Sequence, residues 1–99
     1  MSTPSTSQQM ALVHLPAQLR MRTGGQATAE VASGTVREII TALDHLYPGL
    51  RFNLCHENGE LRPFVNVFVD GRNIRYASVL DTPVAAGSVV HILHSVAGG

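Results

Sequence analysis

The sequence contains no lysine, and all seven of its positively charged residues are arginines. Without lysine, copies of the protein cannot be joined to one another through isopeptide bonds on their side chains. Seven negative charges balance the seven positive ones, so the chain lacks the basic footprint of a nucleic-acid-binding protein. Its single cysteine, Cys55, excludes an internal disulfide and a paired-cysteine redox or zinc motif, and we expect this side chain to be buried or half-buried.

Long apolar runs are absent as well. No run reaches about 18 residues, the length that a membrane-spanning helix needs, and residues 1–9 are polar, with no secretory signal. We therefore expect a cytoplasmic protein that does not bind membranes. The sequence also has no GxxxxGK(S/T) phosphate loop and no constellation of acid, base and nucleophile, so we expect that it is not an enzyme in its own right.

The histidines do not predict a metal site. His91 and His94 are three positions apart in a segment that reads as a strand. Their side chains should therefore point to opposite faces of a sheet and cannot hold one ion together.

The length of 99 residues is that of one domain. Residues 1–9 are of low complexity and we expect them to be disordered; both Met1 and Met10 remain open as the native start. Residues 10–15 and 26–32 read as two strands of an antiparallel hairpin, with a tight turn at Gly24-Gly25.

Residues 36–46 have the pattern of an amphipathic helix. Thr35 and Glu38 form a capping box, in which each side chain accepts a hydrogen bond from the other's backbone amide, and Pro48-Gly49 ends the helix. Apolar side chains recur at spacings of three and four, which gives the helix one apolar face. That face consists of Val36, Ile39, Ile40, Leu43, Leu46 and Tyr47.

The second half of the chain is predicted to contain two more strands. Residues 64–69 alternate as a strong strand, with Asp70-Gly71 as its turn. Residues 88–96 form the last strand, with Val90 and Ile92 facing the core. Between helix and strand, residues 50–63 favour a short hairpin around a turn at 57–60, and we expect core contacts from Phe52, Leu54 and Leu61.

This order of elements predicts an α+β fold. A hairpin, one crossover helix and a last strand in the same sheet give a mixed sheet of four to five strands with the helix on one face, the β-grasp arrangement. The last strand then lies beside the first in the middle of the sheet. We expect a domain over residues 10–95, followed by a flexible tail over residues 96–99.

The tail ends in Gly98-Gly99. Glycine lets a chain pass through a narrow space, and a terminal carboxylate with no neighbouring side chain is an unhindered acyl group. We therefore interpret the Gly99 carboxylate as the reactive group, with Gly98 and Ala97 giving access to it. The alternative is an inert, frayed end, which is common at chain termini.

Two segments resemble the ubiquitin-like sulfur carriers of the MoaD and ThiS families. Residues 80–93, followed by Val96-Ala97-Gly98-Gly99, are similar to the turn, hydrophobic strand and terminal glycines of these carriers. Residues 58–69 and the ending 95–99 are similar to a longer subfamily that supplies sulfur for cysteine synthesis. The sequence departs from the family pattern at Ser88, where aspartate is usual, and at His94, where proline is common.

The resemblance implies a chemistry and a set of partners. An adenylating enzyme of the ubiquitin-activating type would use ATP to activate the Gly99 carboxylate, and a sulfur donor would convert it to a thiocarboxylate. A sulfur-acceptor enzyme such as a cysteine synthase would receive the sulfur, and a metalloprotease could release the product. The carrier would bind no cofactor itself.

Phe68, His91 and Leu93 should project from the sheet face that lacks the helix. An exposed apolar patch of this kind marks a partner-binding surface; the alternative is that Phe68 and Leu93 pack under residues 50–63.

Several functions also remain open. The chain could be the small subunit of a molybdopterin synthase, a carrier for thiazole or secondary-metabolite sulfur, a β-grasp interaction module with an inert tail, or a covalent protein modifier.

Overall fold

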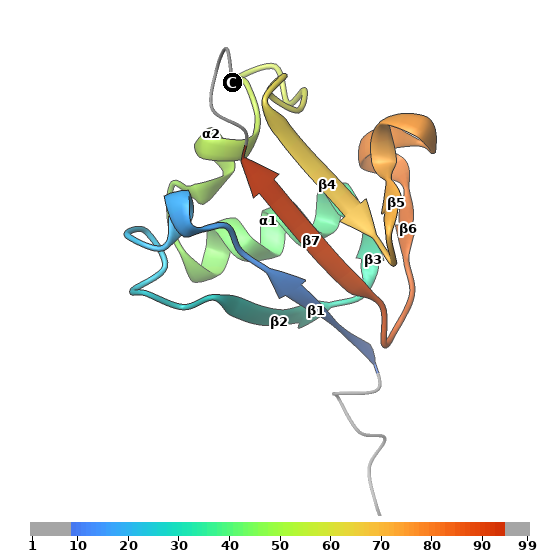
Figure 1. The fold of residues 1–99 in the computed structure, drawn as a ribbon, viewed down its shortest axis with the longest axis horizontal. Helices are drawn as coiled ribbons and strands as arrows, with labels where there is room; N and C mark the ends of the chain where they lie inside the picture. Colours follow the sequence, from blue (N-terminus) through green and yellow to red (C-terminus); the bar gives the residue numbers. More distant parts are fainter. Residues whose placement is uncertain (1–8, 95–99) are drawn as a thin grey trace, which may run out of the picture.

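A computed structural model of the chain describes residues 9–94. Within that range a mixed sheet packs against one main helix (Figure 1). The elements are β1 (Met10–His14), η2 (Ala17–Leu19), β2 (Thr28–Ala32), β3 (Gly34–Thr35), α1 (Val36–Leu46), α2 (Leu50–Leu54), β4 (Val65–Val69), β5 (Arg72–Asn73), η3 (Ile74–Tyr76), η4 (Val79–Asp81), β6 (Pro83–Val84) and β7 (Val89–His94).

The described residues form a five-stranded sheet with the order β2-β1-β7-β4-β5. The β7 strand pairs in parallel with β1, with Val13 opposite Val90, and in antiparallel with β4, with Val67 opposite Ile92. Strands β3 and β6 form a separate two-stranded sheet. The predicted β-grasp arrangement is therefore confirmed, with the last strand in the centre of the sheet.

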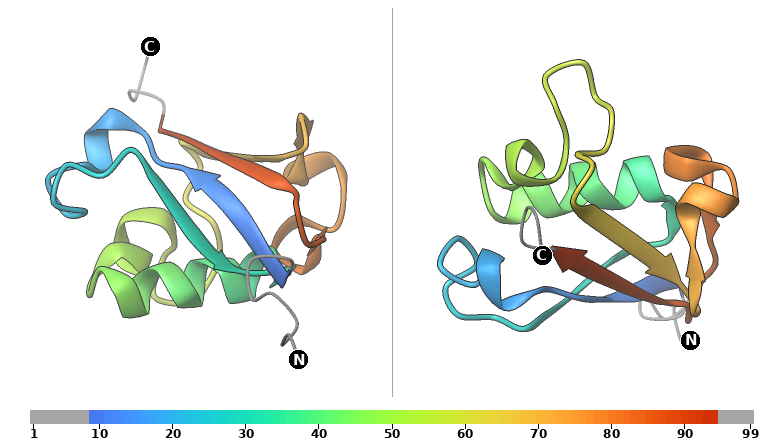
Figure 2. Two further views of the ribbon diagram at one scale, coloured as in Figure 1. Left: turned by 90° about the horizontal axis from the view of Figure 1, so that it is seen from below. Right: turned by 45° about the horizontal axis from the view of Figure 1, so that its top comes forward.

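The core lies between the sheet and α1, which covers one face only (Figure 2). Strand alternation sends Val13, Val67, Val90 and Ile92 toward α1, and each is at most 2% exposed. The helix contributes four buried residues, Val36, Ile39, Ile40 and Leu43. No helix among residues 9–94 covers the opposite face of the sheet.

The helix α1 occupies the predicted residues, and its N-terminus has the predicted capping box. The Glu38 backbone amide donates to the Thr35 hydroxyl at 3.2 Å, and the Glu38 carboxylate accepts from the Thr35 amide at 2.9 Å. The predicted apolar face is correct except at its end, because Leu46 is 53% exposed. Leu46 is the last residue of the helix.

The expectation for residues 50–63 is only partly correct. Leu50–Leu54 is a short helix, α2, and not a strand of a hairpin. An isolated antiparallel bridge joins Cys55 and Leu61 around the expected turn. Leu54 and Leu61 are buried as expected, whereas Phe52 is 56% exposed. On the α2 helix, Leu50 and Leu54 are four residues apart and face the core together, which turns Phe52 outward.

Residues 1–8 and 95–99 lie outside the described part of the chain. The predictions of a disordered N-terminal segment, of the domain limit at residue 95 and of a flexible tail therefore stay predictions. The same holds for the expected roles of Ala97, Gly98 and Gly99.

Candidate functional site

The candidate site begins where β7 ends, at His94, from which residues 95–99 continue. The Gln18 side-chain amide donates to the His94 backbone carbonyl at 3.2 Å. On the other side of the strand, the Phe64 ring lies 5.6 Å from the His94 ring between centroids, tilted by 54°. The last described residue of the chain is thus held from two sides, by the segment after β1 and by the residue before β4.

The strand pairings of β7 also hold His94 in place. The β7 strand has hydrogen-bonded neighbours on both sides, and the β4 pairing extends to the final pair, Val65 with His94. The pairing with β1 covers Val89 to His91, so the last three residues of β7 are held in the sheet by β4. His94, the last described residue, is therefore fixed in position by its pairing with β4.

The sheet face without a helix carries side chains from β2, β1, β7 and β4, and the part of it on β1, β7 and β4 is called the open face below. Cross-strand pairs place Phe68 opposite His91 and Asn66 opposite Leu93. Leu93 is 49% exposed and His91 is exposed, whereas Phe68 is half-buried. The open face consists of Met10, Leu12, His14, Asn66, Phe68, Val89, His91 and Leu93. The alternative in which Phe68 and Leu93 pack under residues 50–63 does not hold for Leu93, which is too exposed.

Two histidines stack on this face. His14 on β1 lies opposite His91 on β7 in the parallel register, and their rings are 4.4 Å apart between centroids and nearly coplanar, at 10°. The stacked rings therefore join the side chains of β1 and β7 into one continuous surface. His94 lies on the other side of β7 from His91, as strand alternation requires.

The carboxylate of Asp70 lies at the start of β7. It accepts a hydrogen bond from the Val89 backbone amide at 2.9 Å and one from the Ser88 hydroxyl at 2.8 Å. These bonds, the backbone one first, favour the charged form and lower the pKa of Asp70 below its ordinary value of 3.8. They tie the β4–β5 turn to the start of β7, at the opposite end of the strand from His94.

Cys55 is buried, as the sequence predicted, at 3% exposure. Burial raises the pKa of its thiol, and the charges of Arg51, Arg37 and Arg62 offset part of that rise. A thiol with a raised pKa is a weak nucleophile at neutral pH.

Metal ligands do not gather in the described part of the chain. Within residues 9–94, no three His, Cys, Asp or Glu side chains come together where they could hold a metal ion. The same residues contain no helix with the length and apolar character to cross a bilayer.

Three contributors to this site were missed by sequence reasoning: Gln18, Phe64 and His14. The position of His14 on the open face follows from its alternation with Val13 on β1. Its contact with His91 depends on the parallel register of β1 and β7, which pairs residues 77 positions apart. The contacts of Gln18 and Phe64 with His94 are similarly long-range, and the local sequence carries no sign of them.

Comparison with known proteins extends over most of the chain. Residues 13–99 match the ThiS family. A putative sulfur carrier protein of Archaeoglobus fulgidus is 37% identical over 87 residues, which span 88% of this chain and 96% of that protein. The sulfur carrier protein CysO of Mycobacterium tuberculosis is 36% identical over 89 residues, with the same coverage of 88% and 96%.

A solved structure has the same fold. A chain in the crystal structure of the Amycolatopsis orientalis BexX/CysO complex superposes with a TM-score of 0.84 at 35% identity, covering 90% of this chain and 99% of that one. The β-grasp fold derived above from the element order is thus found in a similar protein.

Proposed function

Because the chain belongs to the ThiS family, we propose that it is a sulfur carrier protein whose Gly99 carboxylate becomes a thiocarboxylate. The observation that carries this proposal is that the family match runs through β7 to Gly99. Two relatives that are named sulfur carriers, each matched over 88% of the chain, support it further. The protein is then a cosubstrate of other enzymes and not a catalyst.

The chemistry needs an activation step, because a carboxylate is a poor electrophile. A partner enzyme of the ubiquitin-activating type joins the Gly99 carboxylate to the α-phosphate of ATP and releases pyrophosphate. A donor that delivers sulfur at the oxidation level of sulfide then attacks the acyl carbon through its sulfur, which loses its proton, and AMP leaves with the carbon–oxygen bond electrons. The product is a thiocarboxylate, a soft nucleophile that delivers sulfur without free sulfide.

The chain's own residues supply position and recognition in this scheme. The contacts of Gln18 and Phe64 with His94 fix the point from which residues 95–99 start. Gly98 and Gly99 offer no side chain to the walls of the partner's active site. The open face, with Phe68, His91 and Leu93, is the docking surface, since aromatic and aliphatic side chains at the centre of a patch carry most of the binding energy.

The pathway that we propose is cysteine biosynthesis. Its support is the resemblance of residues 58–69 to the longer carriers and the similarity to the proteins named CysO. A cysteine synthase would accept the sulfur, a metalloprotease could release the product, and both would act in the cytoplasm. The complex named for BexX and CysO is an example of a similar chain bound to a protein partner.

Intact-mass spectrometry tests the proposal directly. The purified protein is incubated with ATP, a sulfur source and an activating enzyme that loads a known carrier of the family in the same buffer. We expect one oxygen to be replaced by one sulfur, and fragmentation should place the change at Gly99. An unchanged mass, while the known carrier is loaded, would contradict the proposal.

Substitutions at the tail separate the carrier from its alternatives. Gly98→Ala and Gly99→Ala should slow the loading reaction, whereas Arg72→Gln, at an exposed residue beside the start of β7 and not its end, should not. Loading at the parental rate in both glycine variants would contradict the role of Gly98 and Gly99 in access to the partner's active site. Conjugates of higher mass on immunoblots would instead identify a protein modifier.

A further inference from the structure

The strand β2 leaves one of its backbone edges without a partner among the described residues. It is the first strand in the sheet order and pairs only with β1. Just beyond its two ends, Ala27 accepts from Leu15 and Ser33 donates to Gln9. Because hydrogen-bonding residues alternate in an antiparallel pair, the odd-numbered residues bond to β1. The backbone groups of Thr28, Glu30 and Ala32 therefore face away from the sheet.

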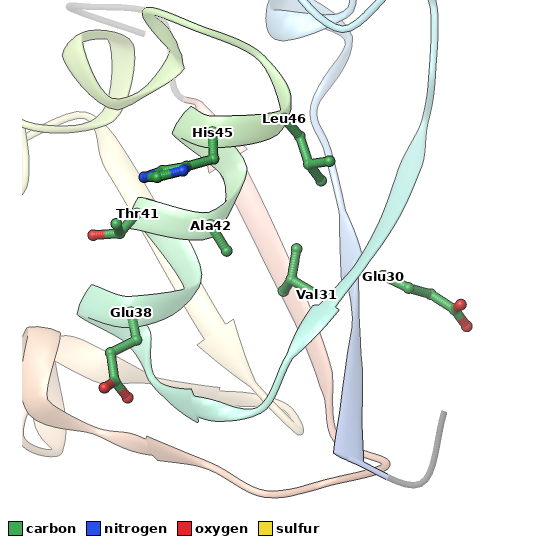
Figure 3. Close-up of a pocket in the computed structure, with 7 residues that line it drawn as sticks. All are labelled: Glu30, Val31, Glu38, Thr41, Ala42, His45 and Leu46. Atoms are coloured by element: carbon green, nitrogen blue, oxygen red, sulfur yellow. The ribbon is translucent and has the colours of Figure 1, made fainter. Parts of the chain in front are cut away.

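An apolar groove lies beside this edge, between β2 and α1 (Figure 3). It has a volume of about 470 Å³ and lies outside the open face. The side chains of Val31, Ala42 and Leu46 point toward one another and form its floor, as Figure 3 shows. Leu46, at 53% exposure, is one of the more exposed aliphatic side chains of the described chain.

The charges around the groove are mainly negative. Glu38 lies on the helix side, and Glu30 projects from the middle of β2 on the side away from α1. His45 also lines the groove and is exposed. A carboxylate at the centre of a free edge opposes pairing with most strands, but it favours a strand that brings a positive charge to the position opposite.

We propose that the β2 edge and the β2–α1 groove bind an extended segment of a partner protein in which aliphatic residues alternate with lysine or arginine. The segment adds a strand to the sheet through the backbone groups of Thr28, Glu30 and Ala32. Its basic residues lie opposite these positions, next to the Glu30 carboxylate. Its aliphatic residues point to the other side and cover Val31, Ala42 and Leu46.

The structure argues against two other occupants. If a second copy paired over the whole of β2 about a twofold axis, Glu30 would face Glu30, and like charges directly opposite destabilise a strand pair. Residues 1–8 are dominated by serine, threonine and glutamine and have almost no apolar side chains to fill the groove. The proposed segment leaves the open face and His94 free, so its binding does not depend on the proposed sulfur chemistry.

An NMR titration of the full chain with a defined peptide tests this inference. The probe is the capped peptide Lys-Val-Lys-Ile-Lys-Val-Lys, and its control has the same side chains with methylated backbone amides. We expect saturable shifts in β2 and the second half of α1, together with slowed hydrogen exchange at the amides of Thr28, Glu30 and Ala32. The methylated peptide should not bind, because it cannot donate the ladder hydrogen bonds.

Two variants with matched controls locate the contact. Glu30→Lys should weaken binding by about tenfold, since it turns an opposite-charge cross-strand pair into a like-charge one, whereas Glu57→Lys, the same charge change in an exposed turn, should not. Leu46→Gln should also weaken binding, whereas Met21→Gln, at a residue 96% exposed, should not.

The inference is overturned if the probe fails to saturate the protein at about 1 mM, or if shifts center on the open face. It is also overturned if the methylated peptide binds equally well, if the control variants weaken binding as much as the test variants, or if sedimentation shows that a second copy occupies the edge.

Discussion

The Ser88 hydroxyl donates a 2.8 Å hydrogen bond to the carboxylate of Asp70, 18 residues earlier in the chain. Together with the bond from the Val89 amide, it ties the β4–β5 turn to the base of β7. Ser88 is one of the two positions at which the sequence departs from the pattern of the sulfur carriers. The departure therefore has a structural role here, because Ser88 is a partner of the turn and is itself 8% exposed.

The Asp70 bonds predict a dependence of stability on acid. The pKa of Asp70 is lowered in the folded state, so its contribution is complete above its ordinary value of 3.8 and is lost as the pH falls through the lower, folded value. We expect Asp70→Asn to be less stable than the parent at neutral pH and to lose less stability between neutral and acid pH. Urea unfolding at several pH values measures both effects.

A comparison with Ser88→Ala separates the two bonds. This variant keeps the backbone bond from Val89, the larger cause of the lowered pKa. It should therefore retain more of the acid dependence than Asp70→Asn. Identical pH profiles for Asp70→Asn and the parent would contradict the assignment.

The short α2 helix predicts opposite results for two neighbouring residues. Leu54 is fully buried, so Leu54→Ala should lower the free energy of unfolding by about 2–5 kcal/mol. Phe52→Ala should change it by only about 0.5 kcal/mol, since Phe52 is 56% exposed. Chemical denaturation of the two variants is a direct check, and a larger loss for Phe52→Ala would show that residues 50–63 pack differently.

The contact of Gln18 with the His94 carbonyl predicts an effect on the loading of sulfur that is separate from folding. Gln18→Ala removes one hydrogen bond, with a net value of about 1 kcal/mol, so thiocarboxylation should slow by at most about fivefold. The melting temperature should change little, because the bond is exposed. Gln26→Ala, at another exposed glutamine, is the control. An equal effect on the loading rate in both variants would show that the Gln18 hydrogen bond has no specific role in loading.

The open face predicts which substitutions weaken binding of the activating enzyme. Phe68→Ala and Leu93→Ala should each cost more than about 1 kcal/mol of binding free energy if they form the centre of the interface. Tyr76→Ala is a matched control, since Tyr76 is 87% exposed and lies outside the open face. Calorimetry with the purified enzyme measures the differences. Unchanged affinity in both test variants would place the interface elsewhere.

Local patterns predicted much of the fold. The α1 helix follows from a capping box and a 3.6-residue period, both contained within a dozen residues, and its limits in the structure are Val36 and Leu46. The alternation of β4 and β7 likewise gave the buried and open faces correctly. In these segments the local preference and the tertiary packing favour the same conformation.

The remaining features depend on contacts between distant residues. Phe52 was expected to contact the core, but the α2 helix turns Leu50 and Leu54 to the core instead. The stack of His14 on His91 depends on the register of a parallel pair. Similarly, the groove beside β2 depends on where α1 crosses the sheet, which no local pattern specifies.

The central position of β7 has a consequence for biosynthesis of the protein. The β1–β2 and β4–β5 pairs are joined only through β7, and β1 and β7 are at opposite ends of the described chain. Non-local strand pairing of this kind forms late, after the chain entropy of a long loop has been lost. A nascent chain on the ribosome therefore cannot complete its sheet until the last strand has been synthesised. A chain truncated before β7 would lack the strand that joins the β1–β2 and β4–β5 pairs.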